Sequence, residues 1–544
     1  MLKKLIFISF CIFTVSVSFS QQELTHADTL RGSITPERAW WDVLHYDLKV
    51  KVNPSEKIIA GSNTISYKVL EGKDRMQIDL QNPMKIDSAV QDGKQLSYTS
   101  DGNAHFLELQ KIQKPGSIDK ITIYFSGKPR EAVRPPWDGG FTWKKDSNGK
   151  HFIATSNQGI GSSVWWPLKD HPSEEADNGV TIAVTAPKDL MDVSNGRLKE
   201  MIENKDSKTW IWEVTNPINS YGVNINIGDY VHFGEKYNGE KGTLDMDYYV
   251  LRENETKAKE QFKQAPLMME AFEHWFGPYP FYEDGYKLVE VPYLGMEHQS
   301  SVTYGNKYKN GYLGSDVSGT GWGLKFDFII IHESGHEWFA NNITNKDVAD
   351  MWVHEGFTSY SENIYLDYHF GKQASSEYVI GVRKNVANKT PIIMGQYNVN
   401  KSGSGDMYYK GANVLHTVRQ LIADDEKWRQ ILRGLNKDFY HQNVTSKLVE
   451  EYISDKSGLD LSVFWNQYLR TILIPKMEYK IDGNKLKFRY TDIVEGFKMP
   501  VIAVINGKEI WLHPTSEWQK QQFPSAIDSF EIKKDFYVNS KKVK

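Results

Sequence analysis

The sequence predicts a multi-domain α+β protein: an N-terminal antiparallel β-domain, a mainly helical middle domain and a small C-terminal β-sandwich. Three observations lead to this fold class. Apolar and polar residues alternate in several segments between residues 41 and 233, which is the pattern of half-buried strands. The pattern is mostly helical in 326–469, and a period of two returns after residue 475. A length of 544 residues suits about three or four domains.

The first twenty residues predict a signal peptide, residues 1–20. Lys3 and Lys4 form a positive start, residues 5–17 are apolar, and small residues precede a cleavage site after Ser20. We therefore expect export to the periplasm or the extracellular space, with an uncleaved membrane anchor as the alternative. No second apolar run of spanning length follows in the sequence. Cys11 is the single cysteine, so the mature chain is expected to lack disulfides.

The β-domain is predicted to span 21–238. Its clearest strand lies near residues 44–52, where Leu, Tyr, Leu, Val and Val alternate with polar residues. The character changes near residue 250, where 256–275 is a helix candidate ended by a Gly-Pro pair. The middle domain is predicted to span 239–474.

The last domain, 475–544, is predicted to be a small β-sandwich. Its segment 502–512 has the pattern of a hairpin that turns at Asn506-Gly507, a dipeptide that favours the tight turns between antiparallel strands.

Composition excludes one large class of function. The chain is 40% hydrophobic and 25% charged, as in ordinary globular proteins. Its formal net charge is −4, so nothing predicts a nucleic-acid partner. The sequence carries no signal for an oligomeric state.

One motif predicts a metal site. His332, Glu333 and His336 form H-E-x-x-H, and Glu355 follows after eighteen residues. Two His four residues apart share one helix face, and two His with one Glu leave a fourth zinc position open for water. Such a motif can also be two surface His without metal. The apolar run 326–331 favours a buried helix instead, where His and Glu need partners or a metal.

At these residues the chain resembles the M1 zinc aminopeptidases, which are gluzincins. The family pattern H-E-x-x-H-x18-E is present in full, and the resemblance extends over nearly the whole mature chain. It implies a thermolysin-like catalytic domain with one zinc ion per chain, held by His332, His336 and Glu355. It further implies that Glu333 acts as the general base on a zinc-activated water.

A second segment resembles the family's G-x-M-E-N strand. It reads Leu294-Gly295-Met296-Glu297-His298, with Leu and His in place of the usual Gly and Asn. The resemblance implies that Glu297 holds the free amine of the substrate, and that Gly295 and Met296 line the substrate site. A carboxylate facing an ammonium group gives a physical reason for a preference for chain ends. The alternative for Glu297 is an ordinary solvated strand residue.

Two further residues are assigned by resemblance. The segment 406–412 resembles the family's Y-x-K-G-A, which selects Tyr408 over Tyr409 as the donor to the reacting carbonyl oxygen. Gln158 resembles the Gln that assists the amine-binding Glu, with an ordinary loop amide as its alternative. The family's large C-terminal helical domain is expected to be missing, because only about seventy residues follow Pro475.

The expected function is that of an exported zinc-dependent aminopeptidase acting on peptides with a free N-terminus. Two alternatives stay open. One is a zinc hydrolase or endopeptidase of different specificity, and the other is a peptide-binding scaffold without hydrolysis.

Overall fold

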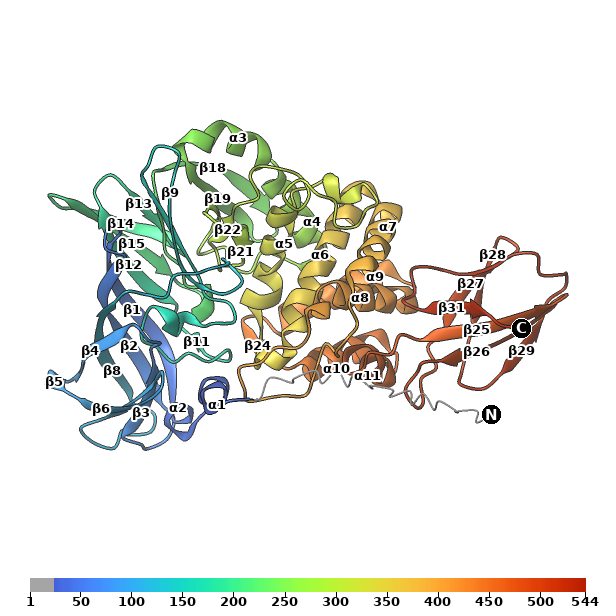
Figure 1. The fold of residues 1–544 in the computed structure, drawn as a ribbon, viewed down its shortest axis with the longest axis horizontal. Coiled ribbons are helices and arrows are strands. Elements are labelled where there is room, and N and C mark those ends of the chain that lie inside the picture. Colours follow the sequence, from blue (N-terminus) through green and yellow to red (C-terminus); the bar gives the residue numbers. More distant parts are fainter. Residues whose placement is uncertain (1–23) are drawn as a thin grey trace, which may run out of the picture.

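The computed structural model describes residues 24–544. Figure 1 shows a β-rich region in blue and green, a helical region in yellow and orange, and a β region in red at the opposite end. This order confirms the predicted fold class. The predicted signal peptide, residues 1–20, and Cys11 lie outside the described residues. Among residues 24–544, no helix has both the length and the apolar character that a membrane crossing requires.

The N-terminal domain is built on an eight-stranded sheet. The sheet is antiparallel except that its first strand, β1, lies parallel to β12, so it is mixed. Its strands, in spatial order, are β14 (Arg197–Glu203), β15 (Ser207–Val214), β12 (Val180–Pro187), β1 (Trp41–Asn53), β2 (Ile58–Val69), β8 (Ile118–Gly127), β4 (Lys85–Gln91) and β5 (Lys94–Gln95).

Strand β1 carries the alternation seen in the sequence, with one shift. Tyr46, Leu48 and Val50 are buried as predicted, but Val43 is buried in place of Leu44. The register to β2 shifts between Val43 and His45, and such a bulge moves every side chain before it to the other face.

Smaller sheets and two short helices complete this domain. They are β13 (Met191–Val193), β17 (Asn226–Gly228), β10 (His151–Ser156) and β9 (Gly140–Lys145); β3 (Arg75–Asp79), β7 (Ala104–Glu108) and β6 (Ser97–Asp101); β11 (Glu175–Ala176) and β16 (Ile218–Asn219); and helices α1 (His26–Gly32) and α2 (Pro36–Ala39).

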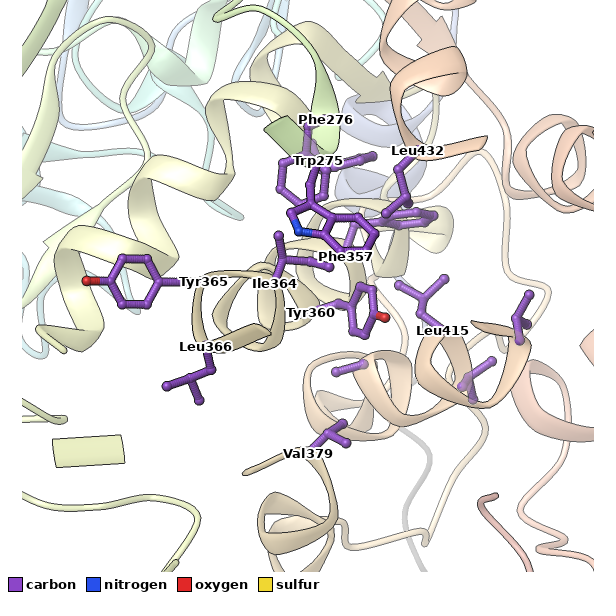
Figure 2. Packing of buried hydrophobic residues seen from close by; sticks show 14 of the residues in the cluster. Trp275, Phe276, Phe357, Tyr360, Ile364, Tyr365, Leu366, Val379, Leu415 and Leu432 are labelled. Carbon is purple, nitrogen blue, oxygen red and sulfur yellow. The ribbon is translucent and has the colours of Figure 1, made fainter. Parts of the chain in front are cut away.

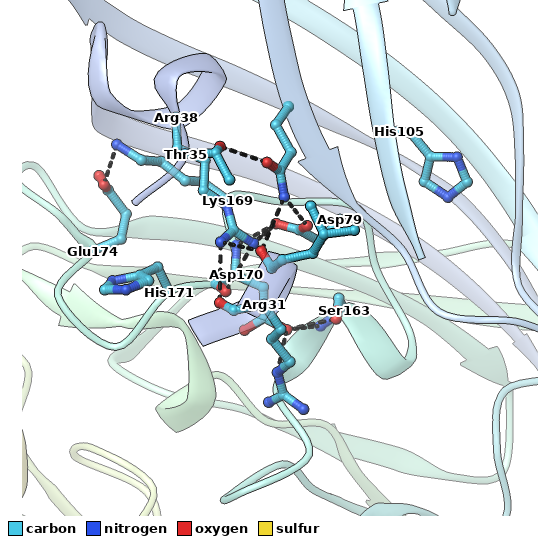
Figure 3. Close-up of polar contacts among 12 residues, drawn as sticks. Arg31, Thr35, Arg38, Asp79, His105, Ser163, Lys169, Asp170, His171 and Glu174 are labelled. Carbon is cyan, nitrogen blue, oxygen red and sulfur yellow. Dashed lines mark hydrogen bonds and ion pairs between the residues drawn. The ribbon is translucent and has the colours of Figure 1, made fainter. Parts of the chain in front are cut away.

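A buried polar cluster ties α2 to the loop that follows β10 (Figure 3). The Arg38 guanidinium donates to Asp79 at 2.6 Å, and the Asp79 carboxylate also accepts from the backbone N–H of Asp170 at 3.1 Å. Asp170 in turn accepts from the Ser163 hydroxyl at 2.5 Å. The cluster therefore holds both ends of the segment 163–170, next to the loop that carries Gln158.

The middle domain combines a five-stranded sheet with a helical bundle. The strands, in spatial order, are β18 (Tyr230–Gly239), β19 (Gly242–Leu251), β20 (Tyr286–Glu290), β22 (Val302–Tyr304) and β21 (Gly295–Met296). A short parallel pair joins β23 (Ile343–Asn345) to β24 (Gln442–Val444). The helices are α3 (Glu255–Gln261), α4 (Gln264–Phe276), α5 (Phe328–Gly335), α6 (Trp352–Phe370), α7 (Lys372–Val382), α8 (Tyr409–Ile422), α9 (Asp425–Asp438), α10 (Ser446–Ser457) and α11 (Ser462–Leu469).

Two details differ from the sequence-based picture. The domain boundary predicted after residue 238 falls inside β18, which pairs with β19 in this sheet. The helix expected over 256–275 is divided into α3 and α4. Pro266 lies in the first turn of α4, where its missing N–H has no helical partner to lose, whereas a continuous helix would have lost a hydrogen bond there.

Helix α6 forms the centre of the bundle (Figure 2). Every residue from Trp352 to Leu366 is buried, and apolar side chains of α4, α7, α8 and α9 surround it. Helix α8 approaches α6 closely because two glycines meet. A Cβ atom added at Gly411 would lie 2.8 Å from the Cα atom of Gly356. The crossing thus depends on the absence of a side chain at Gly411, whereas a Cβ atom at Gly356 would lie 3.4 Å from the Cα atom of Gly411, an ordinary contact.

The C-terminal domain has two sheets, as predicted. One contains β29 (Gln519–Gln522), β26 (Lys485–Thr491), β25 (Lys476–Asp482) and β31 (Asn539–Lys542), and the other contains β28 (Lys508–Leu512), β27 (Val501–Ile505) and β30 (Phe530–Ile532). The hairpin β27–β28 turns at Asn506-Gly507, as expected, with positive φ at both residues.

This domain is fastened to the helical bundle through Asp535. The Asp535 carboxylate accepts from the Ser376 hydroxyl at 2.6 Å and lies 2.9 Å from Nε2 of His416. Arg383 donates to the backbone carbonyl of Lys534 at 2.6 Å.

Candidate active site

Helix α5 presents the first half of the H-E-x-x-H motif. Its N-cap is Asp327, whose carboxylate accepts from the backbone N–H groups of Ile329 and Ile330. The apolar start of the helix is buried, so the sheet and helices around it fix its direction. His332 and Glu333 then follow one and a half turns later on the side that faces the cavity.

The chain leaves the α-helical path directly after the second motif histidine. His336 is the C-cap of α5, and a π-helical segment, Glu337–Asn342, follows with non-helical torsions at Phe339 and Ala340. This kink turns the Phe339 carbonyl back toward His336, whose Nδ1 lies 3.1 Å from it. An Nδ1–H that donates to this carbonyl leaves Nε2 with a free lone pair.

Glu355 comes from the first turn of α6 and completes the predicted set. Its Oε2 atom lies 3.8 Å from Nε2 of His332 and 3.4 Å from Nε2 of His336. One ligand atom from each of the three residues falls within 4.8 Å of the others. The structure therefore brings together the three residues that the motif spacing predicts as metal ligands.

Two residues that support these ligands were missed in the sequence. The Glu362 carboxylate lies 2.9 Å from Nδ1 of His332, and the Thr358 hydroxyl lies 3.0 Å from Nδ1 of His336. Thr358 and Glu362 stand on α6, three and seven residues after Glu355, so they share its helix face. That spacing from Glu355 was the signal in the sequence that could have identified the two residues. Such partners orient the imidazoles and fix which nitrogen is free.

The arrangement fits a zinc ion. Oε2 of Glu355 is buried and has no hydrogen-bond partner among the described residues, although buried carboxylate oxygens are normally satisfied. Burial lowers the pKa of His336 and raises that of Glu355, but their opposite charges outweigh this, so the pKa of His336 rises to about 10 and that of Glu355 falls to about 2. A zinc ion would take the place of the His336 proton. A charged carboxylate and two free imidazole nitrogens that converge on one point form the donor set of a catalytic zinc site.

Glu297 and Gln158 lie on the other side of Glu355. The Gln158 amide donates to Oε1 of Glu297 at 2.6 Å and to Oε1 of Glu355 at 3.1 Å. Burial raises the pKa of Glu297. Glu297 is 3% exposed and is therefore not a solvated strand residue, and Gln158 contacts two carboxylates of the site.

Strand β21 precedes Glu297 and lies close to the metal helix. Gly295 permits this approach, because a Cβ atom there would lie 2.6 Å from a methyl group of Ile329 and 3.3 Å from Cγ of Glu333. The strand is at the edge of its sheet, since only β22 pairs with it. The edge of β21 that has no partner strand lies toward the cavity, which Met296 of this strand lines. His298, in contrast, is fully buried and does not line the cavity.

Tyr408 stands at the start of α8, beside the metal ligands. Its ring stacks on the imidazole of His332, with 6.1 Å between ring centroids and 19° between planes. Burial and then the Glu355 carboxylate raise the pKa of Tyr408 far above its usual range, so its hydroxyl stays protonated. The neighbouring Tyr409 has Glu362 and Tyr312 as its charged or polar neighbours instead.

All nine predicted site residues line one cavity of about 190 Å³. Three carboxylates face it, those of Glu297, Glu333 and Glu355, and no Lys or Arg of residues 24–544 lines it. Burial raises the pKa of Glu333 to about 7. The cavity therefore favours cationic occupants. Its rim includes Trp137, which is 69% exposed and was missed because it lies in a distant loop of the first domain.

The fold and the three converging ligands form a candidate metal centre, and comparison with known proteins identifies the family. Residues 43–221 match the model of the peptidase M1 N-terminal domain, and residues 260–468 match that of the peptidase family M1 domain. Together the two models cover most of the chain. The chain belongs to peptidase family M1, which confirms the resemblance seen in the sequence.

The chain is similar in sequence to aminopeptidases from distant organisms. It is 21% identical to probable aminopeptidase 1 of Sulfurisphaera tokodaii over 509 residues, which cover 88% of this chain and 61% of that protein. It is 24% identical to aminopeptidase N of Lactobacillus helveticus over 450 residues, covering 78% of this chain and 50% of that protein. The chain thus matches only part of the length of these relatives.

A solved structure has the same fold over most of the length of both chains. A mutant M1 zinc metallopeptidase from Deinococcus radiodurans, bound to a Tyr-Ser-Ala substrate, superposes with a TM-score of 0.66 at 21% identity. The superposition covers 81% of this chain and 96% of that chain.

Proposed function

We propose that the protein is a zinc-dependent aminopeptidase that removes the first residue of peptides with a free amine. The observation that supports this most strongly is the charge of the cavity. Three buried carboxylates face a space that no Lys or Arg of the described chain lines, and two imidazoles turn their Nε2 atoms toward Glu355 there. Buried charges need partners, and a zinc ion together with a substrate ammonium group supplies them.

Glu297 is the proposed reader of the ammonium group. Gln158 holds Oε1 of Glu297 and leaves Oε2 for the substrate. The substrate backbone would pair with the free edge of β21, so its chain would run from Glu297 toward Leu294. A peptide blocked at its amine loses the charge-assisted hydrogen bond and leaves Glu297 buried without a partner.

His332, His336 and Glu355 would hold the zinc ion, which supplies Lewis acidity: it polarises a carbonyl and lowers the pKa of water. Glu333, which lies on the same cavity wall, takes the proton of the attacking water and delivers it to the leaving amine. The Tyr408 hydroxyl donates a hydrogen bond to the carbonyl oxygen as that oxygen gains charge. Glu362 and Thr358 keep the two imidazoles in orientation throughout.

The names of similar proteins support a peptide substrate. Several relatives are named aminopeptidases, and the Deinococcus radiodurans metallopeptidase was crystallised with a tripeptide substrate. The direct test is a panel of aminoacyl chromogenic amides, with and without a chelator. We expect hydrolysis that the chelator abolishes and added zinc restores. Stoichiometric zinc with no hydrolysis of any amide would favour a peptide-binding scaffold instead.

We also propose that the protein is exported. The proposal depends on residues 1–20, with their two lysines, apolar run and small residues before position 21. Intact-mass measurement of the mature protein should show cleavage after Ser20 and recovery outside the cytoplasm. A full-length mass in the membrane fraction would indicate an uncleaved anchor.

A further inference from the structure

A second cavity of about 370 Å³ adjoins the candidate active site. Trp137 and Leu294 line both cavities, so these two side chains form the boundary between them. Much of the second cavity is walled by aromatic and apolar side chains, among them Tyr293, Tyr308 and Leu313. Because it shares Trp137 and Leu294 with the candidate active site, the second cavity is placed to extend the substrate-binding space.

The direction of β21 decides which part of a peptide would reach this cavity. The substrate amine is proposed to lie at Glu297, and Leu294 lies three residues back along the chain. At roughly 3.3 Å per residue, this separation is about 10 Å, or three residues of an extended peptide. The backbone N–H of Gly305 donates to the Leu294 carbonyl at 2.7 Å, which keeps the segment after β22 beside this end of β21. The cavity therefore lies near the third substrate residue, on the leaving side of the scissile bond.

One cation lines this second cavity, and its ammonium group is free. Lys307 is exposed and makes no hydrogen bond or ion pair with any residue in 24–544. Its backbone is held in place nearby, because Tyr308 N–H donates to the Tyr304 hydroxyl at 2.9 Å. Tyr304 in turn donates to Asp327, the N-cap of α5, at 2.7 Å. The turn that carries Lys307 is thus anchored to α5, the helix that carries His332.

The single carboxylate among the residues that line this cavity is already engaged. Glu290 accepts from the backbone N–H of Leu251 at 2.7 Å and from the Asn254 amide at 2.7 Å. Both carboxylate oxygens of Glu290 therefore already have hydrogen-bond donors. Lys307 therefore has the charge available for a ligand, in contrast to the active-site cavity, where the free charges are negative.

We propose that the second cavity binds the leaving-side residues of the substrate and that Lys307 favours a carboxylate near the third residue. The carboxylate can be the C-terminus of a tripeptide or an acidic side chain of a longer peptide. This inference rests on the proposed aminopeptidase function and adds a substrate preference to it. The pairing is between exposed groups, so its effect on kcat/KM should be about two- to fivefold.

The test compares two matched pairs of substrates. One pair is a tripeptide and its C-terminal amide, and the other is a pentapeptide with Glu or Gln at its third position. The zinc-loaded protein should prefer the acidic member of at least one pair, and Lys307→Met should abolish that preference. The matched control is Lys309→Met, since Lys309 is also exposed but does not line the cavity. The preference should also weaken at high ionic strength.

An aminoacyl nitroanilide serves as the reference, because it is too short to reach Lys307. If no variant cleaves it or any peptide, the proposed function itself is wrong. If the protein cleaves it but shows no acidic preference, or Lys307→Met keeps the preference, the inference is wrong. A preference confined to the tripeptide pair identifies the C-terminal carboxylate as the group bound, and one confined to the pentapeptide pair identifies the side chain.

Discussion

Loss of the Glu333 carboxylate should separate chemistry from metal binding. Glu333 also forms a candidate group with Glu297 and His336, but it is not one of the three proposed zinc ligands, so Glu333→Gln should retain zinc. Removing a general base typically costs about 10²–10⁴ in rate. Turnover and zinc content should be measured together, with the exposed Glu451→Gln as a control. Wild-type turnover in Glu333→Gln would mean that another group acts as the base.

Adjacent tyrosines offer a matched pair of variants. Tyr408 stacks on His332 and has Glu355 near its hydroxyl, whereas Tyr409 has Glu362 and Tyr312 as neighbours. Loss of one donor to the reacting oxygen typically costs about 10²–10³ in kcat. We expect Tyr408→Phe to lose this much with zinc retained, and Tyr409→Phe to lose far less. A larger loss for Tyr409→Phe would exchange their roles.

His298 makes stability depend on pH. Burial lowers its pKa to about 3, whereas an unfolded chain has a His pKa near ~6.5. The unfolded state therefore binds a proton that the folded state does not, and stability is lost as the pH falls below about 6.5. The slope for one such group is about 1.4 kcal/mol per pH unit.

The variant His298→Asn lacks this titration. We expect its unfolding free energy, measured by denaturant, to gain on that of the wild type as the pH falls from 6.5 to 4.5. The difference between the two proteins should stay constant between pH 7 and 8. A difference that is constant at all of these pH values would show that His298 is not buried in its neutral form.

Residue spacing predicted the metal ligands but not their supports. Local helix geometry was enough to bring His332 and His336 together, whereas Glu355 comes from a second helix and was assigned by the spacing of the motif. Glu362 is on the same helix face as Glu355 and could have been found by its spacing. Trp137 could not have been found, because a loop of the first domain reaches the cavity only through tertiary packing.

At the scale of elements, the crossing of α6 and α8 sets where Tyr408 stands relative to Glu355. A side chain at Gly411 would meet the backbone of Gly356 at 2.8 Å. Gly411→Ala should therefore lower both the melting temperature and kcat, although Ala is the better helix former, because overpacking typically costs about 1–3 kcal/mol.

The control for this variant is Gly405→Ala. Gly405 lies just before Tyr408, and a Cβ atom there would meet nothing within 4 Å. Its melting temperature and kcat should stay close to the wild-type values. If Gly411→Ala also behaves as wild type, α8 can shift without disturbing the site, and the close crossing is not what places Tyr408.

The periodicity of the sequence predicted most elements but not their long-range pairing. The alternation near residues 44–52 identified β1, yet nothing local showed that β12 would lie parallel to it. The sequence pattern predicted one helix over 256–275. It did not predict that this helix is divided into α3 and α4 near Pro266. Pairing and breaks of this kind depend on tertiary contacts, which local patterns do not contain.

At the scale of the whole molecule, the site needs two domains. Gln158 and Trp137 come from the N-terminal domain, and the metal ligands, Glu297 and Tyr408 come from the helical domain. The polar cluster of Arg38, Asp79 and Asp170 steadies the loop region that brings Gln158 to Glu297 and Glu355. Recognition of the substrate amine is therefore a property of the assembled chain.

The most direct test compares one tripeptide with its N-acetylated form, using the zinc-loaded protein and the chelated protein. We predict rapid removal of the first residue from the free peptide, little or no cleavage of the acetylated peptide, and no cleavage of either after chelation. Equal cleavage of both peptides, or cleavage that survives removal of the metal, would contradict the claim that one cation and Glu297 together read and cut the start of a peptide.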